Sequence, residues 1–135
     1  MIEKGFYALL AGTVGVTNLV STRIYPNKAP QNAGTRYVVY RRTMNEPRRH
    51  LKGSSNLKRA VISVECFGAT YDQAKELYSA VYAAIGENGT TATWDSQSVK
   101  IAYWEDDSDD YVPPQTKDDV GVHSILMELV VWYSV

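Results

Sequence analysis

The sequence predicts a single α+β domain, in which an antiparallel sheet of two hairpins and a short strand carries two helices on one face. Segments of alternating apolar residues follow one another directly, which indicates strands that pair as hairpins. A segment with a helical apolar stripe separates the two hairpins, so it can cross over one face of their shared sheet. The 135 residues, 44% hydrophobic and 21% charged, fit one domain over residues 1–135.

The first part of the chain is helical and then extended. Apolar side chains recur at helical spacing over residues 3–11, with an acid in the first turn, and Gly12 terminates this first predicted helix. Residues 16–20 add a short second turn. Residues 23–25 form a brief extended segment that a proline stops, and the β-branched and aromatic residues 36–42 predict a strand.

A second helix follows the next strand. Residues 56–68 predict that strand, with apolar side chains on one face. Thr70 is the predicted N-cap, and Gln73 completes a capping box three residues later. An apolar stripe continues to Ile85, and Gly86 ends the helix. This helix therefore links the two hairpins.

Two further strands complete the predicted sheet. Residues 99–105 alternate between apolar and polar side chains, and residues 120–135 carry one unbroken apolar face. That face consists of Ile125, Met127, Leu129, Val131 and Tyr133. The opposite face is mixed and consists of Ser124, Leu126, Glu128, Val130 and Trp132.

A strongly basic segment joins the first two long strands. Residues 41–59 contain seven bases and a single acid, Glu46. The seven bases are Arg41, Arg42, Arg48, Arg49, Lys52, Lys58 and Arg59. Turn-forming residues stand at both ends of the segment, so we predict a long hairpin loop over residues 43–56 that extends as an arm.

An acidic segment joins the last two strands. Residues 105–119 contain seven acids and a single base, Lys117. The acids that we assign to a site are Asp106, Asp107, Asp109 and Asp110. The charge block and the prolines at 113 and 114 predict a second long hairpin loop over residues 106–119.

The two charged segments balance one another in a chain of net charge −1. Such separation suits a subunit whose positive face meets the negative face of a neighbour. We therefore predict that the seven bases and four aspartates named above line a subunit interface or the lumen of an assembly. The ten tyrosines fit interfaces, where tyrosine is favoured, and fit strands equally well.

The sequence gives little support for an enzyme or a metal site. The acidic segment lacks EF-hand spacing, so a solvated charge run is preferred to a calcium or magnesium site. Cys66 is predicted to be a core residue and His123 a structural histidine, which leaves no catalytic triad. A single cysteine also excludes an internal disulfide. We predict a protein that is not an enzyme and uses no cofactor or metal.

Nucleic-acid binding is the alternative function. The basic segment has the electrostatic footprint of a DNA-binding surface. It contains no aromatic residue for base stacking between residues 41 and 59, so contacts would be to the backbone, without sequence readout. A nucleic-acid-binding accessory protein that uses residues 41–59 therefore stays open.

No targeting or membrane segment is visible. The N-terminus lacks the pattern of a secretory signal, and no apolar run reaches the length of a membrane span. The single cysteine fits a reducing compartment. We expect a soluble protein that is made in the cytoplasm and has no membrane partner.

The order of motifs resembles the tail completion or tail terminator proteins of long-tailed bacteriophages. The similarity runs through about the first 85 residues, and beyond Gly86 only the strand pattern matches. The segments that carry it are the opening helix leading to Leu19-Val20, Thr22-Arg23-Ile24-Tyr25-Pro26, Ala29-Pro30-Gln31, Arg36-Tyr37-Val38-Val39-Tyr40, Val61-Ile62-Ser63-Val64-Glu65-Cys66-Phe67 and Thr70-Tyr71-Asp72-Gln73-Ala74.

The resemblance implies a small α+β subunit of the virion, without an active site. Such subunits assemble as a ring, usually a hexamer, that caps the head-proximal end of the tail tube. The implied partners are copies of the chain itself, the tail tube protein and the head-completion or connector protein, with non-specific contact to DNA passing through the lumen. The long acidic loop, with its prolines and aspartates, departs from the family pattern.

Overall fold

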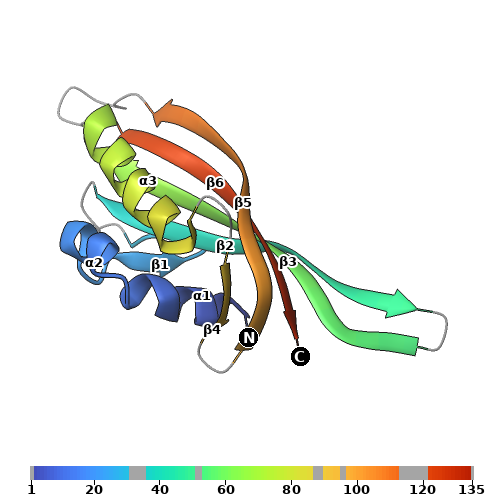
Figure 1. Ribbon diagram of the computed structural model, residues 1–135. Coiled ribbons are helices and arrows are strands. Elements are labelled where there is room, and N and C mark those ends of the chain that lie inside the picture. The colour runs from blue at the N-terminus through green and yellow to red at the C-terminus, as the bar shows by residue number, and fades with distance from the viewer. Residues whose placement is uncertain are drawn as a thin grey trace.

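The computed structural model describes residues 2–30, 36–50, 53–86, 90–94, 97–112 and 122–134. These residues form three helices and a six-stranded sheet of order β1-β2-β3-β6-β5-β4 (Figure 1). The helices are α1 (Ile2–Ala11), α2 (Val14–Val20) and α3 (Tyr71–Ile85). The strands are β1 (Ile24–Pro26), β2 (Tyr37–His50), β3 (Gly53–Gly68), β4 (Thr90–Trp94), β5 (Gln97–Val112) and β6 (Val122–Ser134).

The sheet is mixed, so the predicted antiparallel sheet is partly right. The hairpins β2–β3 and β5–β6 are both present, and they join into one sheet because β3 pairs antiparallel with β6. The short segment before Pro26 is β1, but it pairs parallel to β2. The prediction also lacked the edge strand β4 and the separate helix α2.

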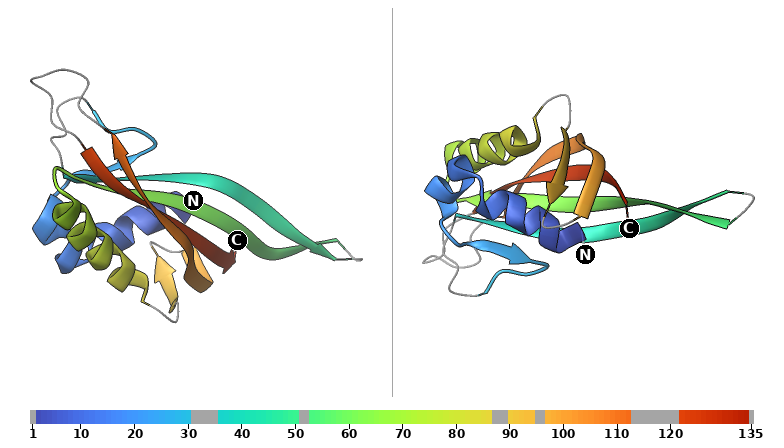
Figure 2. Two further views of the ribbon diagram at one scale, coloured as in Figure 1. Left: turned by 90° about the horizontal axis from the view of Figure 1, so that it is seen from above. Right: turned by 60° about the horizontal axis from the view of Figure 1, so that its bottom comes forward.

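All three helices cover one face of the sheet and build the core against it (Figures 1 and 2). Phe6 of α1 contacts the rings of Tyr40 and Trp94, with centroids 5.9 and 6.1 Å away. A Cβ on Gly5 would lie 2.8 Å from the Trp94 carbonyl oxygen. Helix α1 therefore reaches β4 closely because residue 5 has no side chain.

Helix α3 begins and ends as the sequence predicts. The Thr70 hydroxyl accepts the Gln73 backbone N–H at 3.2 Å, and the Gln73 side-chain oxygen accepts the Ala69 N–H at 3.1 Å. The first bond satisfies a backbone donor that the first turn leaves free, and the second ties the Gln73 side chain to the residue before the N-cap. Gly86 then ends the helix with a φ of 91°, a conformation that favours glycine.

The strands of the first hairpin are longer than predicted. The predicted loop over residues 43–56 is wrong, because β2 continues to His50 and β3 starts at Gly53. Residues 51 and 52 lie outside the described part. Pro47, which predicts a turn, is part of β2. At this residue β2 pairs only with β3 among the described strands, and the register shifts between Pro47 and Arg49.

The acidic segment is likewise a strand rather than a loop up to Val112. Strand β5 pairs with β6 from Ser98 opposite Ser134 to Val112 opposite Val122. The backbone N–H and C=O groups of the central strand β6 need hydrogen-bonding partners on both sides, and β5 supplies those on one side along the whole strand. The predicted loop over residues 106–119 is therefore wrong up to Val112, and residues 113–121 lie outside the described part.

The distal end of hairpin β2–β3 leaves the sheet. Strand β6 pairs with β3 only as far as Leu57, opposite Ser134. Beyond this point, residues 48–50 and 53–56 pair only with each other among the described strands; we call these residues the arm. Figures 1 and 2 show the arm projecting well beyond the rest of the fold.

Candidate functional site

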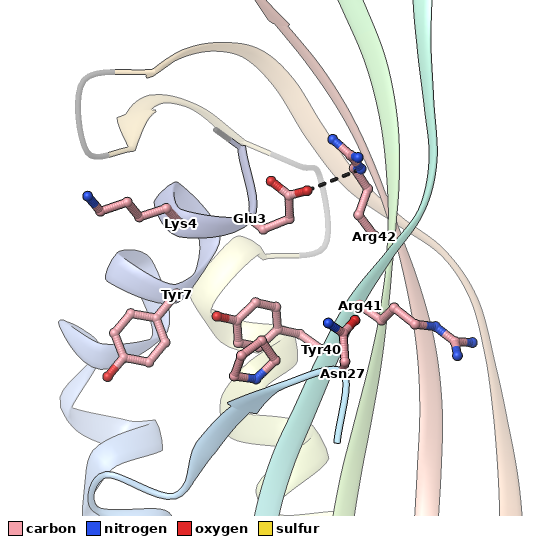
Figure 3. A pocket seen from close by; sticks show the side chains of 8 residues that line it. Glu3, Lys4, Tyr7, Asn27, Tyr40, Arg41 and Arg42 are labelled. Atoms are coloured by element: carbon pink, nitrogen blue, oxygen red, sulfur yellow. Dashed lines mark ion pairs between the residues drawn. The ribbon is translucent and has the colours of Figure 1, made fainter. Parts of the chain in front are cut away.

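The bases at the root of the arm are divided between the two faces of the sheet. Arg42 lies on the helix face, where its Nε is 3.1 Å from a carboxylate oxygen of Glu3 in α1. Arg41 points to the opposite side of β2, away from Glu3 (Figure 3). Both arginines are exposed. The predicted cluster of bases is thus not one continuous patch here.

The bases of β3 are divided in the same way. The Arg59 guanidinium lies 6.0 Å from the Trp132 ring centroid and donates to the Met44 sulfur at 3.2 Å. Lys58 pairs across the ladder with Tyr133, whose side chain belongs to the helix-covered core. Both bases are only half-buried.

Two of the three remaining bases lie in the arm. Arg48 and Arg49 lie in the part of β2 that belongs to the arm. Lys52 falls outside the described residues. Arg42 and Lys58 thus lie on the helix side of the sheet, and Arg41 and Arg59 lie on the opposite side. These four bases do not form one surface.

The aspartates of β5 alternate between the two faces, as residues of a strand must. Asp107 and Asp109 face α3. The Tyr78 hydroxyl donates to Asp107 at 2.7 Å, and the Tyr71 hydroxyl donates to Asp109 at 3.1 Å. Lys75 lies over both tyrosine rings, with Nζ 4.9 Å from the Tyr78 centroid and 5.8 Å from the Tyr71 centroid. These aspartates therefore hold β5 to α3.

Burial and the hydrogen bond to Asp107 raise the pKa of Tyr78 from 10.0 to about 12. Burial comes first among the causes, and the charges of Asp107, Tyr82 and Asp109 act in the same direction. The phenol is therefore kept neutral and remains a donor over the ordinary pH range.

Asp106 and Asp110 lie on the opposite face of the sheet, together with two glutamates. Asp106 is directly opposite Glu128 in the β5–β6 ladder. Burial raises the pKa of Glu65, the charge of Asp110 raises it further, and that of Arg41 lowers it. The registers of β3, β6 and β5 put Glu65 and Asp110 on one face of the sheet.

Sequence reasoning did not assign Glu65 or Glu128 to the site. Glu128 stood on the mixed face of the last predicted strand, and Glu65 alternated with Val64 and Cys66 in another. The alternation of apolar and polar residues shows that each glutamate faces away from the core side of its own strand. Only the register between β3 and β6 shows that the two glutamates lie on the same face of the sheet.

A cleft of about 490 Å³ lies between α1 and β2 at the root of the arm (Figure 3). It is lined by Glu3, Lys4, Tyr7, Pro26, Asn27, Tyr40, Arg41 and Arg42. Burial raises the pKa of Tyr40, with Tyr7 and Glu3 adding to the effect. One Glu3 carboxylate oxygen is buried without a hydrogen-bond partner among the described residues.

The residues considered for catalysis are structural. Cys66 is buried in the core, as predicted, and its thiol contacts the Met127 sulfur at 3.9 Å. Burial, followed by the charge of Glu65, raises the pKa of the Cys66 thiol and so disfavours the nucleophilic thiolate. His123 packs against Tyr111, with ring centroids 4.5 Å apart. With Tyr71 and Tyr111 it forms an aromatic cluster at the start of β6.

Within the described part of the chain, no group of three or more histidines, cysteines or acids is placed to hold a metal ion. None of the described helices is long and apolar enough to cross a membrane.

The chain is similar to solved structures over almost its whole length. One is a chain of the virion of a native gene transfer agent particle, with 16% identity, 96% of this chain and 92% of that chain covered, and a TM-score of 0.65. A second solved chain has 13% identity, coverage of 99% and 93%, and a TM-score of 0.58. At these identities the likeness shows a shared fold. No curated protein sequence matches this chain.

The family model described as tail completion protein gp17 matches residues 4–132. The match therefore extends well past Gly86. Beyond that residue, the resemblance seen in the sequence alone consists only of the strand pattern. It spans all three helices except the first two residues of α1, and all strands except the last two residues of β6. This protein belongs to the tail completion protein gp17 family: it is a structural protein of the bacteriophage virion tail and not an enzyme.

Proposed function

We propose that this protein assembles into a ring, with six subunits, that caps the head-proximal end of the tail tube and joins the tail to the head. Its partners are then neighbouring copies, the tail tube protein and the head-completion or connector protein. The family supports a role in tail completion. The ring, its size and its partners are the proposed part.

The arm is the observation that carries the proposal. A two-stranded ribbon without a hydrophobic face against other elements is marginally stable in water. Residues 41–59, which include the arm, carry seven bases against one acid, whereas the acids gather on β5 and its neighbours. A contact between two different surfaces of one chain is heterologous, and it closes into a ring when the rotation per subunit divides the circle.

The proposed contact sets the bases of residues 41–59 against the acidic segment of the next subunit. The bases come from Arg41, Arg42, Arg48, Arg49, Lys52, Lys58 and Arg59. The aspartates are Asp106 and Asp110, because Asp107 and Asp109 already accept hydroxyls of α3 in their own subunit. Exposed ion pairs are screened by salt, so the ring should loosen at high ionic strength.

The mass of the purified protein, alone and with isolated tail tubes, tests the ring. Six chains of 15.1 kDa give a ring of about 91 kDa, which analytical ultracentrifugation separates clearly from a monomer. We expect this mass in at least the sample with tubes. A monomer in both samples would contradict the ring.

Contact with DNA in the lumen is a separate proposal that the basic residues support. We expect weak, salt-dependent binding of duplex DNA that is insensitive to sequence. Tight duplex binding by the monomer at physiological salt, lost in an Arg48→Glu/Arg49→Glu variant, would favour the nucleic-acid-binding accessory protein instead of the ring.

A further inference from the structure

The face of the sheet opposite the helices differs in charge between its two ends. No described helix covers it, and we call it the helix-free face. Toward the arm it carries Arg59, which lies against Trp132. Away from the arm it carries the carboxylates of Glu65, Glu128, Asp106 and Asp110.

These four carboxylates are poorly balanced within the described part of their own chain. Asp106 and Glu128 are directly opposite in the ladder, an arrangement of like charges that destabilises a sheet. Arg41 is a base on this face: it pairs with Ser63, which pairs with Glu128. Burial and Asp110 raise the pKa of Glu65, whereas the charge of Arg41 lowers it. Among the described residues, none of the four carboxylates forms an ion pair.

The chain's own arm cannot supply the missing cations. In β3, the arm begins beyond Leu57, whereas Glu65 lies eight residues further along the same strand, about 26 Å away at 3.3 Å per residue. The arm also projects away from this end of the sheet (Figure 1). A base on the arm can therefore meet these carboxylates only in another copy.

We propose that the arm of each subunit lies across the helix-free face of the next, with its bases against Glu65, Glu128, Asp106 and Asp110. This inference rests on the proposed ring and names the surface that receives the arm. Asp107 and Asp109 are not part of that surface, because they lie on the other face of β5, where they accept the hydroxyls of Tyr78 and Tyr71 of α3. The contact orders the arm and relieves the repulsion between Asp106 and Glu128.

Two variants with the same change of charge on one strand test this division. Asp106→Asn/Asp110→Asn removes two carboxylates from the helix-free face, and Asp107→Asn/Asp109→Asn removes two that face α3. We expect the first variant to raise the concentration for half-assembly at least about tenfold, since close charge pairs across interfaces carry large couplings. The second should assemble like the wild type and melt at a lower temperature.

A mixing experiment tests whether the contact joins different copies. Arg48→Glu/Arg49→Glu makes the arm acidic, and Asp106→Lys/Asp110→Lys/Glu128→Lys makes the receiving face basic, since three lysines then stand against Glu65. Each variant alone should stay dissociated although circular dichroism shows it to be folded. Their equimolar mixture should form rings, because alternating subunits then offer opposite charges at every contact.

The outcomes separate this inference from the ring itself. If the wild type forms no ring, alone or with tail tubes, the proposed function fails. If the wild type forms rings and Asp106→Asn/Asp110→Asn assembles equally well, the ring stands and the arm does not use this face. Normal rings of Asp106→Lys/Asp110→Lys/Glu128→Lys with a new affinity for duplex DNA would mean that the face lines the channel, which also overturns the inference.

Discussion

The hairpins β2–β3 and β5–β6 are both long and highly charged, yet their surroundings differ. Strand β5 pairs with β6 along its whole length and with β4 up to Ala102, and two of its aspartates accept hydrogen bonds from tyrosines of α3. Hairpin β2–β3 outruns the sheet after Leu57 and ends in the arm. Both hairpins therefore contain a block of charged residues within a strand. In β5–β6, part of this block makes contacts within the subunit, whereas in β2–β3 the arm is available to other subunits.

Truncation in the packed hairpin should have the largest effect on the stability of the single chain. Leu129 of β6 is fully buried. We expect Leu129→Ala to lower the free energy of unfolding by about 2–5 kcal/mol, through lost burial and the cavity left behind. Chemical denaturation measures it. Ile101→Ala on β5, where the side chain is 40% exposed, is the control and should cost well under half as much.

The bond between α3 and β5 should contribute less. Tyr78→Phe removes the 2.7 Å hydrogen bond to Asp107 and should lower the free energy of unfolding by about 0.5–1.5 kcal/mol. Tyr71→Phe removes the longer, exposed bond to Asp109 and should cost less. Equal stability of Tyr78→Phe and the wild type would show that this bond does not hold β5 to α3.

The same tyrosine predicts a loss of stability in alkali. The pKa of Tyr78 is about 12 in the folded chain, above its ordinary value of 10.0, so its contribution is complete below pH 10 and lost as the pH rises toward 12. Melting temperatures measured from pH 8 to 12 should therefore fall more steeply for the wild type than for Tyr78→Phe. Parallel curves would contradict the assignment.

Glu65→Gln should have a small effect of opposite sign. Burial and Asp110 raise the pKa of Glu65, so the folded chain favours its neutral form and ionisation reduces stability as the pH rises through that pKa. Glu65→Gln should raise the melting temperature slightly at pH 7, and the gain should vanish below pH 4.5, the ordinary value. A lower melting temperature at pH 7 would show that Glu65 has a stabilising partner within the subunit.

Removal of the arm should affect folding least and assembly most. If residues 48–56 are replaced by an Asn-Gly turn, the melting temperature of the monomer should change little, because β6 borders β3 only up to Leu57. Ring formation should be abolished. Rings of normal mass from the shortened chain would show that the two hairpins do not differ in function.

The parts of the fold with local signals could be predicted from the sequence. The capping residues Thr70 and Gln73 and the terminal Gly86 located α3, and the apolar alternation of β3 and β6 located the central strands. Strand β4 has only five residues, and the parallel pairing of β1 depends on a register that no local pattern encodes. Charged and turn-forming residues predict loops over the two charged segments, yet these segments lie in strands, because strands at exposed edges tolerate both kinds of residue.

The candidate site was predictable in composition but not in arrangement. The opposed charges are visible in the chain, whereas the pairing of Arg42 with Glu3 joins residues 39 positions apart. The division of the aspartates into two faces depends on the β5 register, including the shift between Trp104 and Asp106. Glu65 joins the acidic face only when β3 and β6 are side by side.

Strand β3 also has a mechanical consequence. It runs without interruption from the arm, between β2 and β6, to Gly68 below the start of α3, where a Cβ would lie 2.6 Å from the Ala74 nitrogen. Ladder hydrogen bonds are perpendicular to the strands. A pull on the arm along its axis would load the bonds of β3 to both neighbours in shear, all at once, instead of opening them one by one. A subunit held by its arm would therefore transmit tension to its centre before any strand could peel away.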